Sequence, residues 1–243
     1  MFRCLDDRFS RSEALLGSEA MARLKAARVL VVGVGGVGSW CAEALVRTGL
    51  GHITLMDDDV VAESNVNRQC PATSKTLGQP KVEAMRNHLL AINPDCDIAT
   101  LEDRYTSTVD LDLSPRPSLI VDAIDSVDCK AELILDATEA GVPIVSSMGA
   151  ALRLDPAKVK VTRFEKVEGD GLARALRQRF KKLGRFPKRK FSCVWSAEQT
   201  ATTPRREDAS GTVVKGSLMP VTATFGMCLA SEAIKILTKG EMK

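Results

Sequence analysis

RVLVVGVGGVGSWCAEALVRTGLGHITLMD, residues 28–57, decides the fold of this chain. It opens with β-branched residues that are too apolar for a strand facing solvent, which predicts a buried parallel strand over 28–33. The helix that follows is closed by Gly49 and Gly51, and HITLMD at 52–57 predicts a second strand. These three elements form a strand–helix–strand unit, the building block of a parallel sheet.

The alternation of strands and helices continues on both sides of this unit. Apolar residues at helical spacing over 12–26 predict a helix before the first strand. Further on, the pattern predicts helices over 79–92 and 126–140 and strands at 96–101, 119–125 and 142–149. This order predicts an α/β fold with a doubly wound, mainly parallel sheet of the Rossmann type and right-handed crossovers.

The texture of the sequence changes after Pro156. VKVTRFEKV at 159–167 alternates like an antiparallel strand, and FSCVWS at 191–196 predicts another short strand. Residues 197–216 are polar and poor in pattern, which predicts a long mobile loop, and a final helix is expected from about Pro220. We therefore expect one domain over 1–243, with a nucleotide-binding core at 1–150 and a C-terminal antiparallel extension at 151–243.

Composition narrows the class of protein. The net charge of +3 over 243 residues is too small to define a partner by itself. Seven cysteines without a CxxC pair predict reduced thiols in a cytoplasmic protein and no structural zinc. The charged N-terminus does not resemble an export signal, and the apolar run 225–230 is far shorter than the ~20 residues of a membrane span.

A glycine-rich loop lies between the first strand and its helix. Its glycines are Gly33, Gly35, Gly36 and Gly38, and glycine there permits a tight turn in which backbone N–H groups meet phosphate at a helix start. Asp57 follows 19 residues after Gly38, where an acid that binds ribose hydroxyls is expected. The pattern predicts a nucleotide or dinucleotide site; the alternative is glycine used only for close helix–strand packing.

A nicotinamide dinucleotide is the default ligand for such a loop. A hydride-transfer enzyme would also need a proton donor, often histidine, near its substrate. The chain has two histidines, His52 at the start of a strand and His88 in mid-helix, and both positions favour surface or packing roles. The dehydrogenase hypothesis therefore lacks its second half.

Charged residues after the second strand favour a triphosphate instead. Asn65 and Arg68 follow the ribose acid, and Lys81 begins the next helix, so two cations can converge on phosphates above the glycine loop. Asp125 ends the strand over 119–125 at the carboxyl edge of the sheet, where it can hold Mg²⁺ or position a reacting phosphate. The alternative is that Arg68 and Lys81 are solvated helix charges.

The motifs GVGGVGSWCAEALVRTGLGHITLMDDD, SNVNRQ, GQPKVE and DAIDS together resemble the adenylation domain of ubiquitin-activating enzymes and bacterial sulfur-carrier adenylyltransferases. That family uses ATP to make a carboxyl-adenylate. The resemblance implies Asp125 near the α-phosphate and Mg²⁺, and it implies ATP contacts for Gly35, Asp57, Asn65, Arg68 and Lys81. RFSR at 8–11 resembles an N-terminal segment whose last arginine reaches the partner subunit's site, so Arg11 is a candidate acting in trans and a homodimer is implied.

One branch of the family fits best. Sulfur-carrier adenylyltransferases usually carry a zinc-binding pair of CxxC motifs, which this sequence lacks. GVGSW, DAIDSV, CVWSAE and VTATFGM instead resemble the tRNA threonylcarbamoyladenosine dehydratases, which implies ATP-dependent cyclisation of a modified adenosine in tRNA. Adenylation of a carrier protein's C-terminal glycine and a non-catalytic nucleotide-binding role stay open as alternatives, as do a monovalent cation and a sulfurtransferase-type partner.

A basic stretch without acids suits an RNA substrate. Phe180, Phe186 and Phe191 are interleaved with its cations. Its cations are Arg174, Arg177, Arg179, Lys181, Lys182, Arg185, Lys188, Arg189 and Lys190. They predict several phosphate contacts; the alternative is a solvated helix face with phenylalanines that pack inward. Cys193, the cysteine nearest the long loop, is interpreted as a small buried residue rather than a reactive thiol.

Overall fold

The computed structural model describes residues 8–106, 115–198, 207 and 213–239, and it contains a seven-stranded sheet. The strands, in chain order, are β1 (Arg28–Val32), β2 (His52–Met56), β3 (Asp97–Leu101), β4 (Leu119–Asp122), β5 (Ile144–Ser147), β6 (Val159–Arg163) and β7 (Ser192–Ser196). Their order across the sheet is β3-β2-β1-β4-β5-β7-β6. All neighbours are parallel except β6 and β7, so the predicted α/β fold with an antiparallel extension is confirmed.

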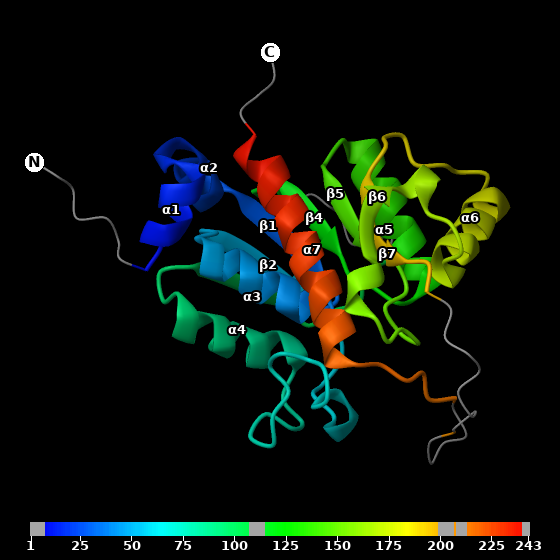
Figure 1. Ribbon diagram of the computed structural model, residues 1–243, viewed down its shortest axis with the longest axis horizontal. Helices are drawn as coiled ribbons and strands as arrows, with labels where there is room; N and C mark the ends of the chain where they lie inside the picture. Colours follow the sequence, from blue (N-terminus) through cyan, green and yellow to red (C-terminus); the bar gives the residue numbers. More distant parts are fainter. Residues whose placement is uncertain (1–7, 107–114, 199–206, 208–212, 240–243) are drawn as a thin grey trace, which may run out of the picture.

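Helices cover both faces of the sheet (Figure 1). The α-helices are α1 (Ser10–Leu16), α2 (Ser18–Ala26), α3 (Gly38–Thr48), α4 (Lys81–Ile92), α5 (Val127–Ala140), α6 (Gly171–Leu183) and α7 (Met219–Thr238). Single 3₁₀ turns are η1 (Glu63–Asn65), η2 (Pro156–Lys158) and η3 (Phe164–Lys166). The described ends of α3, α4, β6, β7 and α7 agree with the sequence predictions to within a few residues.

Each buried strand contributes to two separate cores. Val29 and Val31 of β1 belong to the core under α3, α4 and α7, whereas Leu30 and Val32 belong to the core under α5 and α6. Side chains alternate between the faces of a strand, so a strand buried on both sides must be apolar at every position. This explains why the run RVLVV lacks the polar alternation of a surface strand.

The last helix, α7, crosses the face of α3 in the same view. Its length and its mean hydropathy of 1.3 would suffice for a membrane span, but Phe225 and Leu229 are fully buried in the core. A Cβ atom on Gly226 would lie 2.6 Å from the carbonyl oxygen of Val37, so glycine lets α7 touch the backbone at the start of α3. Among the described helices, α7 is therefore a core helix of this sheet.

Two local predictions differ from the structure, and a third lies mostly outside the described residues. The helix expected over 12–26 is divided into α1 and α2 at Gly17, whose φ of +82° ends the first helix. The strand expected to end at Asp125 ends at Asp122, so Asp125 lies in the loop beyond β4. Most of the loop predicted at 197–216 lies outside the described residues, and within it Glu207 forms an isolated bridge with Val213.

Candidate nucleotide-binding site

The glycine loop, residues 33–38, joins the end of β1 to the start of α3. Gly33 has a φ of +91°, and a Cβ atom there would lie 2.7 Å from the carbonyl oxygen of Ala123. A Cβ atom on Gly38 would lie 1.8 Å from the carbonyl oxygen of Gly33. Only glycine fits at these two positions, and the tight turn brings backbone N–H groups to the positive end of α3. The loop can therefore accept an anion.

Asp57 lies directly against this loop. Its Oδ2 atom accepts a hydrogen bond from the backbone N–H of Val34 at 2.6 Å. Lys81 at the start of α4 is 5% exposed, and its Nζ lies 2.6 Å from the Asp59 carboxylate and 3.8 Å from that of Asp57. Burial raises the pKa of Asp57, and the nearby Lys81 offsets part of that rise. The alternative interpretation of Lys81 as a solvated helix charge is wrong.

Packing and hydrogen bonds fix Arg68 and its neighbours to the start of α3, the helix that follows the glycine loop. A Cβ atom on Gly36 would lie 3.2 Å from Cγ of Arg68, so the arginine side chain covers the loop. The indole N–H of Trp40 donates to the carbonyl oxygen of Arg68 at 2.9 Å, and the Cys70 N–H donates to Ser39 Oγ at 3.1 Å. The two α3 residues in these bonds, Trp40 and Ser39, belong to the first turn of that helix. The segment with Arg68 is thus fixed to the helix that begins at the loop.

The turn before Arg68 is built by Asn65. The Asn65 Oδ1 atom accepts a hydrogen bond from the Ala62 N–H at 3.0 Å, which closes the 3₁₀ turn η1. Nη1 of Arg68 donates to the carbonyl oxygen of Ser64 at 2.9 Å. Arg68 therefore meets the loop at Gly36 while Lys81 meets it through Asp57. The two cations come from separate segments and converge on one loop.

Asp125 lies at the same edge of the sheet, in the loop after β4. The two residues before it pack against Gly33, whose Cβ position lies within 3.1 Å of the Ile124 nitrogen. The Asp125 side chain is exposed, and no ion pair involves it within the described ranges. An exposed carboxylate beside an anion-binding loop suits Mg²⁺ that is also bound by phosphate oxygens. The residues present therefore fit the predicted magnesium ion.

A buried ion pair that was not predicted from the sequence supports the loop after β4 that contains Asp125. Nζ of Lys130 in α5 lies 2.8 Å from Asp122 Oδ1 and donates to the Ile124 carbonyl oxygen at 2.8 Å. The Ser146 hydroxyl donates to Asp122 Oδ2 at 2.6 Å. Lys130 and Asp122 are fully buried. The available signal was a lysine on the apolar face of a predicted helix, because lysine is rarely buried without a partner.

Arg11 lies far from this site within its own chain. It is exposed on α1, whose neighbour Phe9 packs near Gly49 at the C-terminal end of α3. The glycine loop is at the other end of that helix, and eleven residues of α-helix span roughly 16 Å. The structure thus does not bring Arg11 to the other predicted site residues. The role in trans stays a prediction, since it needs a second copy of the chain.

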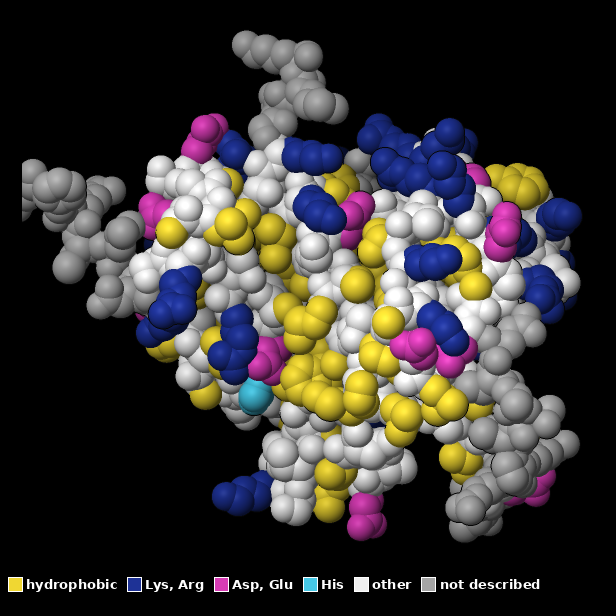
Figure 2. All heavy atoms as spheres, in the orientation of Figure 1, with side chains coloured by type: hydrophobic (Ala, Val, Ile, Leu, Met, Phe, Trp, Pro, Cys, Tyr) yellow, Lys and Arg dark blue, Asp and Glu magenta, His cyan; other side chains and the backbone are white. Residues whose placement is uncertain are grey.

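The basic stretch forms α6 and the segment after it. Figure 2 shows Lys and Arg side chains gathered at the upper right, on the side of the molecule where α5 and α6 lie in Figure 1. Phe180 and Phe191 are buried in the core, whereas Phe186 is exposed. Arg177 donates to the carbonyl oxygens of Phe164 and Val167 at 3.0 and 2.7 Å. Arg177 therefore fastens α6 to η3 and is only half-exposed.

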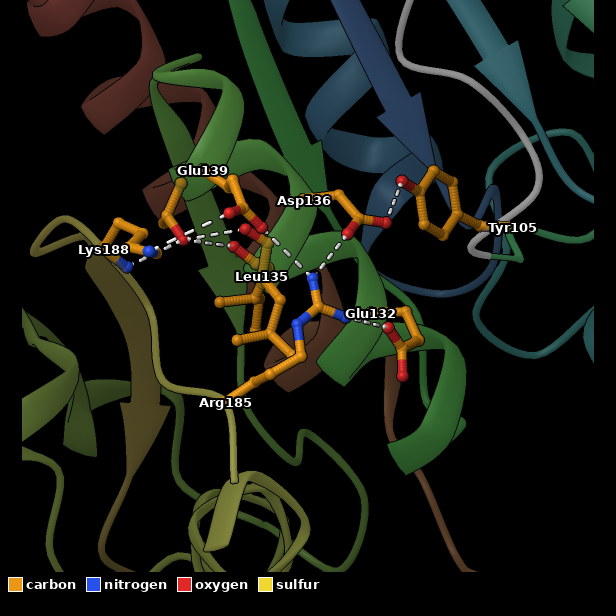
Figure 3. Close-up of polar contacts among 9 residues, drawn as sticks. Tyr105, Glu132, Leu135, Asp136, Glu139, Arg185 and Lys188 are labelled. Atoms are coloured by element: carbon orange, nitrogen blue, oxygen red, sulfur yellow. Dashed lines mark hydrogen bonds and ion pairs between the residues drawn. The ribbon is translucent and has the colours of Figure 1, made fainter. Parts of the chain in front are cut away.

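Several of the predicted RNA contacts are engaged in ion pairs with the protein. Arg185 lies among three acids of α5, with nitrogen–oxygen distances of 3.1 Å to Glu132, 3.2 Å to Asp136 and 3.3 Å to Glu139 (Figure 3). Lys188 lies 3.8 Å from Glu139. Burial is the largest single influence and lowers the pKa of Arg185, but the hydrogen bonds and charges of these acids together outweigh it and raise the pKa. The acids lower the net positive charge near these two side chains.

Other cations of the stretch are available to a ligand. Arg179 pairs with Asp128 at 2.9 Å, and Arg189 donates to the Gly141 carbonyl oxygen at 3.4 Å. Within this stretch, as far as the structure describes it, the exposed cations that form neither an ion pair nor a hydrogen bond with the protein are Arg174, Lys181, Lys182 and Lys190. A cavity of about 480 Å³ between α6 and residues 186–191 is lined by phenylalanine rings and by basic side chains that include Lys181 and Lys190.

Cys193 in β7 is fully buried, and burial raises the pKa of its thiol well above the ordinary range. This agrees with the interpretation as a packing residue. No disulfide links the cysteines in the described part of the chain. His88 is not a lone surface residue, because its Nε2 lies 2.9 Å from a Glu43 carboxylate oxygen and 3.4 Å from the Cys70 sulfur. That contact could not be read from the sequence.

Comparison with known proteins finds relatives that are similar over most of the chain. The chain is 39% identical to the tRNA threonylcarbamoyladenosine dehydratase of Escherichia coli K12, over 94% of this chain and 92% of that protein. It is 33% identical to the molybdopterin-synthase adenylyltransferase of Salmonella typhimurium, over 95% of this chain and 81% of that one. The crystal structure of the E. coli dehydratase TcdA with ATP superposes with a TM-score of 0.86 at 37% identity, covering 97% of both chains.

The family match extends over nearly the whole chain. It begins at residue 9 and ends at residue 243, so it includes the glycine loop, the two converging cations and the C-terminal extension. The resemblance inferred from GVGGVG, SNVNRQ, GQPKVE and DAIDS is thereby confirmed. The chain belongs to the ThiF family.

Proposed function

We propose that this protein uses ATP to dehydrate threonylcarbamoyladenosine in tRNA, closing a ring on the modified base. The observation that carries the proposal is the convergence of Arg68 and Lys81 on a glycine loop in a chain similar to such dehydratases almost end to end. A dinucleotide needs less positive charge than a triphosphate, and the E. coli relative binds ATP. The geometry therefore supports an enzyme that activates a carboxylate with ATP.

The chemistry consists of two displacements. A carboxylate oxygen of the threonylcarbamoyl group attacks the α-phosphorus of ATP, and pyrophosphate leaves. An atom of the same modified base then attacks the acyl carbon, AMP leaves with the carboxylate oxygen, and a proton is lost. The net change is the loss of one water from the nucleoside and cleavage of ATP to AMP and pyrophosphate. Neither step needs a protein nucleophile, which agrees with the burial of Cys193.

The chain's own residues act by position and charge. Backbone N–H groups of the glycine loop bind the phosphates, and Asp57 binds the ribose hydroxyls. Arg68 and Lys81 offset the charge that develops on the α-phosphate and on the leaving pyrophosphate. Asp125 would hold Mg²⁺, which supplies charge neutralisation at the phosphate oxygens. The Lys130–Asp122 pair keeps the loop of Asp125 in place.

A homodimer would complete the site. Arg11 cannot reach the glycine loop of its own chain, so its phosphate contact requires a partner copy. Apolar side chains form a band across the lower centre of Figure 2, over the end of the molecule at which α7 begins in Figure 1. Leu218, Met219 and Met227 of this region are 40–45% exposed. Burial of such a patch between two copies would offset its exposure to water.

The tRNA would bind along α6. Lys181, Lys182, Arg174 and Lys190 are exposed cations without an ion pair among the described residues, and each can neutralise one phosphate. The cavity beside them is lined by aromatic rings and is large enough for a base. Arg185 and Lys188 contribute less because the acids of α5 already neutralise them.

Nucleoside mass analysis tests the proposal directly. Purified protein is incubated with ATP and tRNA that carries threonylcarbamoyladenosine, and the expected product is lighter by one water. Lys81→Ala should lower the rate by roughly 10²–10³-fold, the usual effect of removing one preorganised charge contact. Lys75→Ala on the exposed surface is the matched control and should keep full activity.

The same reaction distinguishes the main alternative, which the similarity to molybdopterin-synthase adenylyltransferases favours. Pyrophosphate release that is stimulated by a carrier protein ending in Gly-Gly, and not by tRNA, would assign the chain to carrier adenylation. ATP binding without pyrophosphate release in either case would assign it a non-catalytic role. Release stimulated by tRNA alone supports the dehydratase.

A further inference from the structure

Outside the nucleotide site, three metal-binding side chains meet where α3, α4 and the segment with Arg68 come together. Cys70 Sγ lies 2.6 Å from Glu43 Oε2, His88 Nε2 lies 2.9 Å from the same oxygen, and sulfur and nitrogen are 3.4 Å apart. The three ligand atoms lie within 4.8 Å of one another. They come from separate elements of the chain, so the fold rather than local spacing brings them together.

We propose that Glu43, Cys70 and His88 form a site for one transition-metal ion, best suited to Zn²⁺. Thiolate, imidazole and carboxylate are the three side-chain ligands that zinc takes, and three protein ligands leave a fourth position for water. Glutamate and thiolate together balance the charge of a divalent ion. Mg²⁺ and Ca²⁺ prefer oxygen ligands and would not choose a site with sulfur and nitrogen.

The distances fit with a small adjustment. Ligand atoms around tetrahedral zinc lie roughly 3.3–3.6 Å apart, which follows from bond lengths of about 2.0–2.3 Å. The sulfur–nitrogen distance already has that value, and the two distances to Glu43 must lengthen by roughly 0.5–1 Å. The short sulfur–oxygen contact is a hydrogen bond that the Cys70 thiol donates to Glu43. Metal binding releases the thiol proton, so this hydrogen bond is lost and the two atoms can move apart.

The surroundings hold the ligands in place. The other Glu43 oxygen accepts a hydrogen bond from Nε of Arg47 at 2.6 Å, which orients the carboxylate toward the cluster. The Glu43 side chain is only 12% exposed, whereas that of His88 is 36% exposed, so one side of the site is open to solvent. The backbone N–H of Cys70 is bonded to Ser39 at the start of α3. An ion can enter without unfolding the segment.

Such an ion would cross-link the elements that supply the phosphate contacts. Glu43 lies one turn after Ser39 on the helix that begins at the glycine loop, Cys70 lies two residues after Arg68, and His88 lies on the helix that begins with Lys81. The expectation of no structural zinc rested on absent CxxC pairs, and this cluster is of another kind. The inference does not depend on the proposed tRNA reaction.

Cobalt binding tests the site with a readout independent of activity. The purified chain is freed of metal with a chelator and titrated with Co²⁺, and the near-ultraviolet sulfur-to-cobalt band and the bound metal are measured. We expect one Co²⁺ per chain with that band, displaced by Zn²⁺. Cys70→Ser and His88→Gln should lose the band and the bound metal, and Arg47→Met should bind about 10-fold more weakly.

Cys228→Ser, which removes a half-buried thiol on α7 outside the cluster, should bind as the unchanged chain does. Far-ultraviolet circular dichroism and ATP binding establish that Cys70→Ser and His88→Gln are folded. Metal that stays bound in both variants, or that binds without a sulfur band, lies elsewhere and overturns the inference. Absence of binding by the unchanged chain at micromolar Co²⁺ and Zn²⁺ overturns it as well.

Discussion

Lys130→Met should destabilise the protein strongly and loosen the loop of Asp125. The side chains of Lys130 and Asp122 have no exposed surface, and their charges lie 2.8 Å apart. Removal of the lysine leaves a buried carboxylate with one hydroxyl donor, Ser146, and one backbone donor. Breaking a buried pair in this way costs about 3–5 kcal/mol. A typical domain has only about 5–15 kcal/mol of stability, so the loss is large.

Urea unfolding followed by tryptophan fluorescence measures this loss as a change in the free energy of unfolding. Lys182→Met, an exposed lysine on α6, is the matched control and should change it by less than about 0.5 kcal/mol. The double variant Asp122→Asn with Lys130→Met replaces the stranded charge by an amide. It should therefore be more stable than the sum of the single losses by about 0.5–3 kcal/mol. A loss below ~1 kcal/mol for Lys130→Met, or strict additivity, would refute the reasoning.

Three further outcomes follow from the site. Gly38→Ala should abolish ATP binding, measured by calorimetry, because its Cβ atom would lie 1.8 Å from the Gly33 carbonyl oxygen; unchanged affinity would contradict the loop geometry. Asp57→Asn should weaken ATP binding yet not lower the free energy of unfolding at pH 7. Because the pKa of Asp57 is raised in the folded state, its ionised form destabilises the fold. This destabilisation develops as pH rises from the unfolded to the folded pKa and is absent below that window. Urea midpoints at pH 7 and at acidic pH check the sign. For tRNA, Lys181→Ala should reduce the salt slope of binding by about 1, whereas Arg185→Ala should change it less because of its acid partners; equal changes would remove the distinction.

The sheet could be predicted because its strands are buried on both faces. A run such as RVLVV, followed by glycines and an amphipathic helix, has few other folds available to it. The shared location of Asp57, Arg68 and Lys81 could be predicted for a related reason. The carboxyl ends of parallel strands meet at one edge of the sheet, and all three residues follow the second strand. Their individual contacts with ATP are what the family resemblance implies.

Contacts between segments that lie far apart in the sequence could not be predicted. Arg185 pairs with acids 46 to 53 residues earlier, and the Glu43–Cys70–His88 cluster joins two helices and a loop. No spacing rule connects such positions, because their proximity is produced by helix packing. Gly17 was missed for a different reason: an isolated glycine is tolerated within a helical pattern, and only its positive φ shows that the helix ends there.

The position of α7 has a consequence for biosynthesis. This helix is the last of the described elements to emerge from the ribosome, yet through Gly226 it touches the backbone where the glycine loop becomes α3. Until it arrives, an apolar face of the nucleotide-binding half is open to water and to other nascent chains. The nucleotide-binding half is thus translated first but cannot complete its core until α7 has been made. Until then its exposed apolar face is the kind of surface to which chaperones bind.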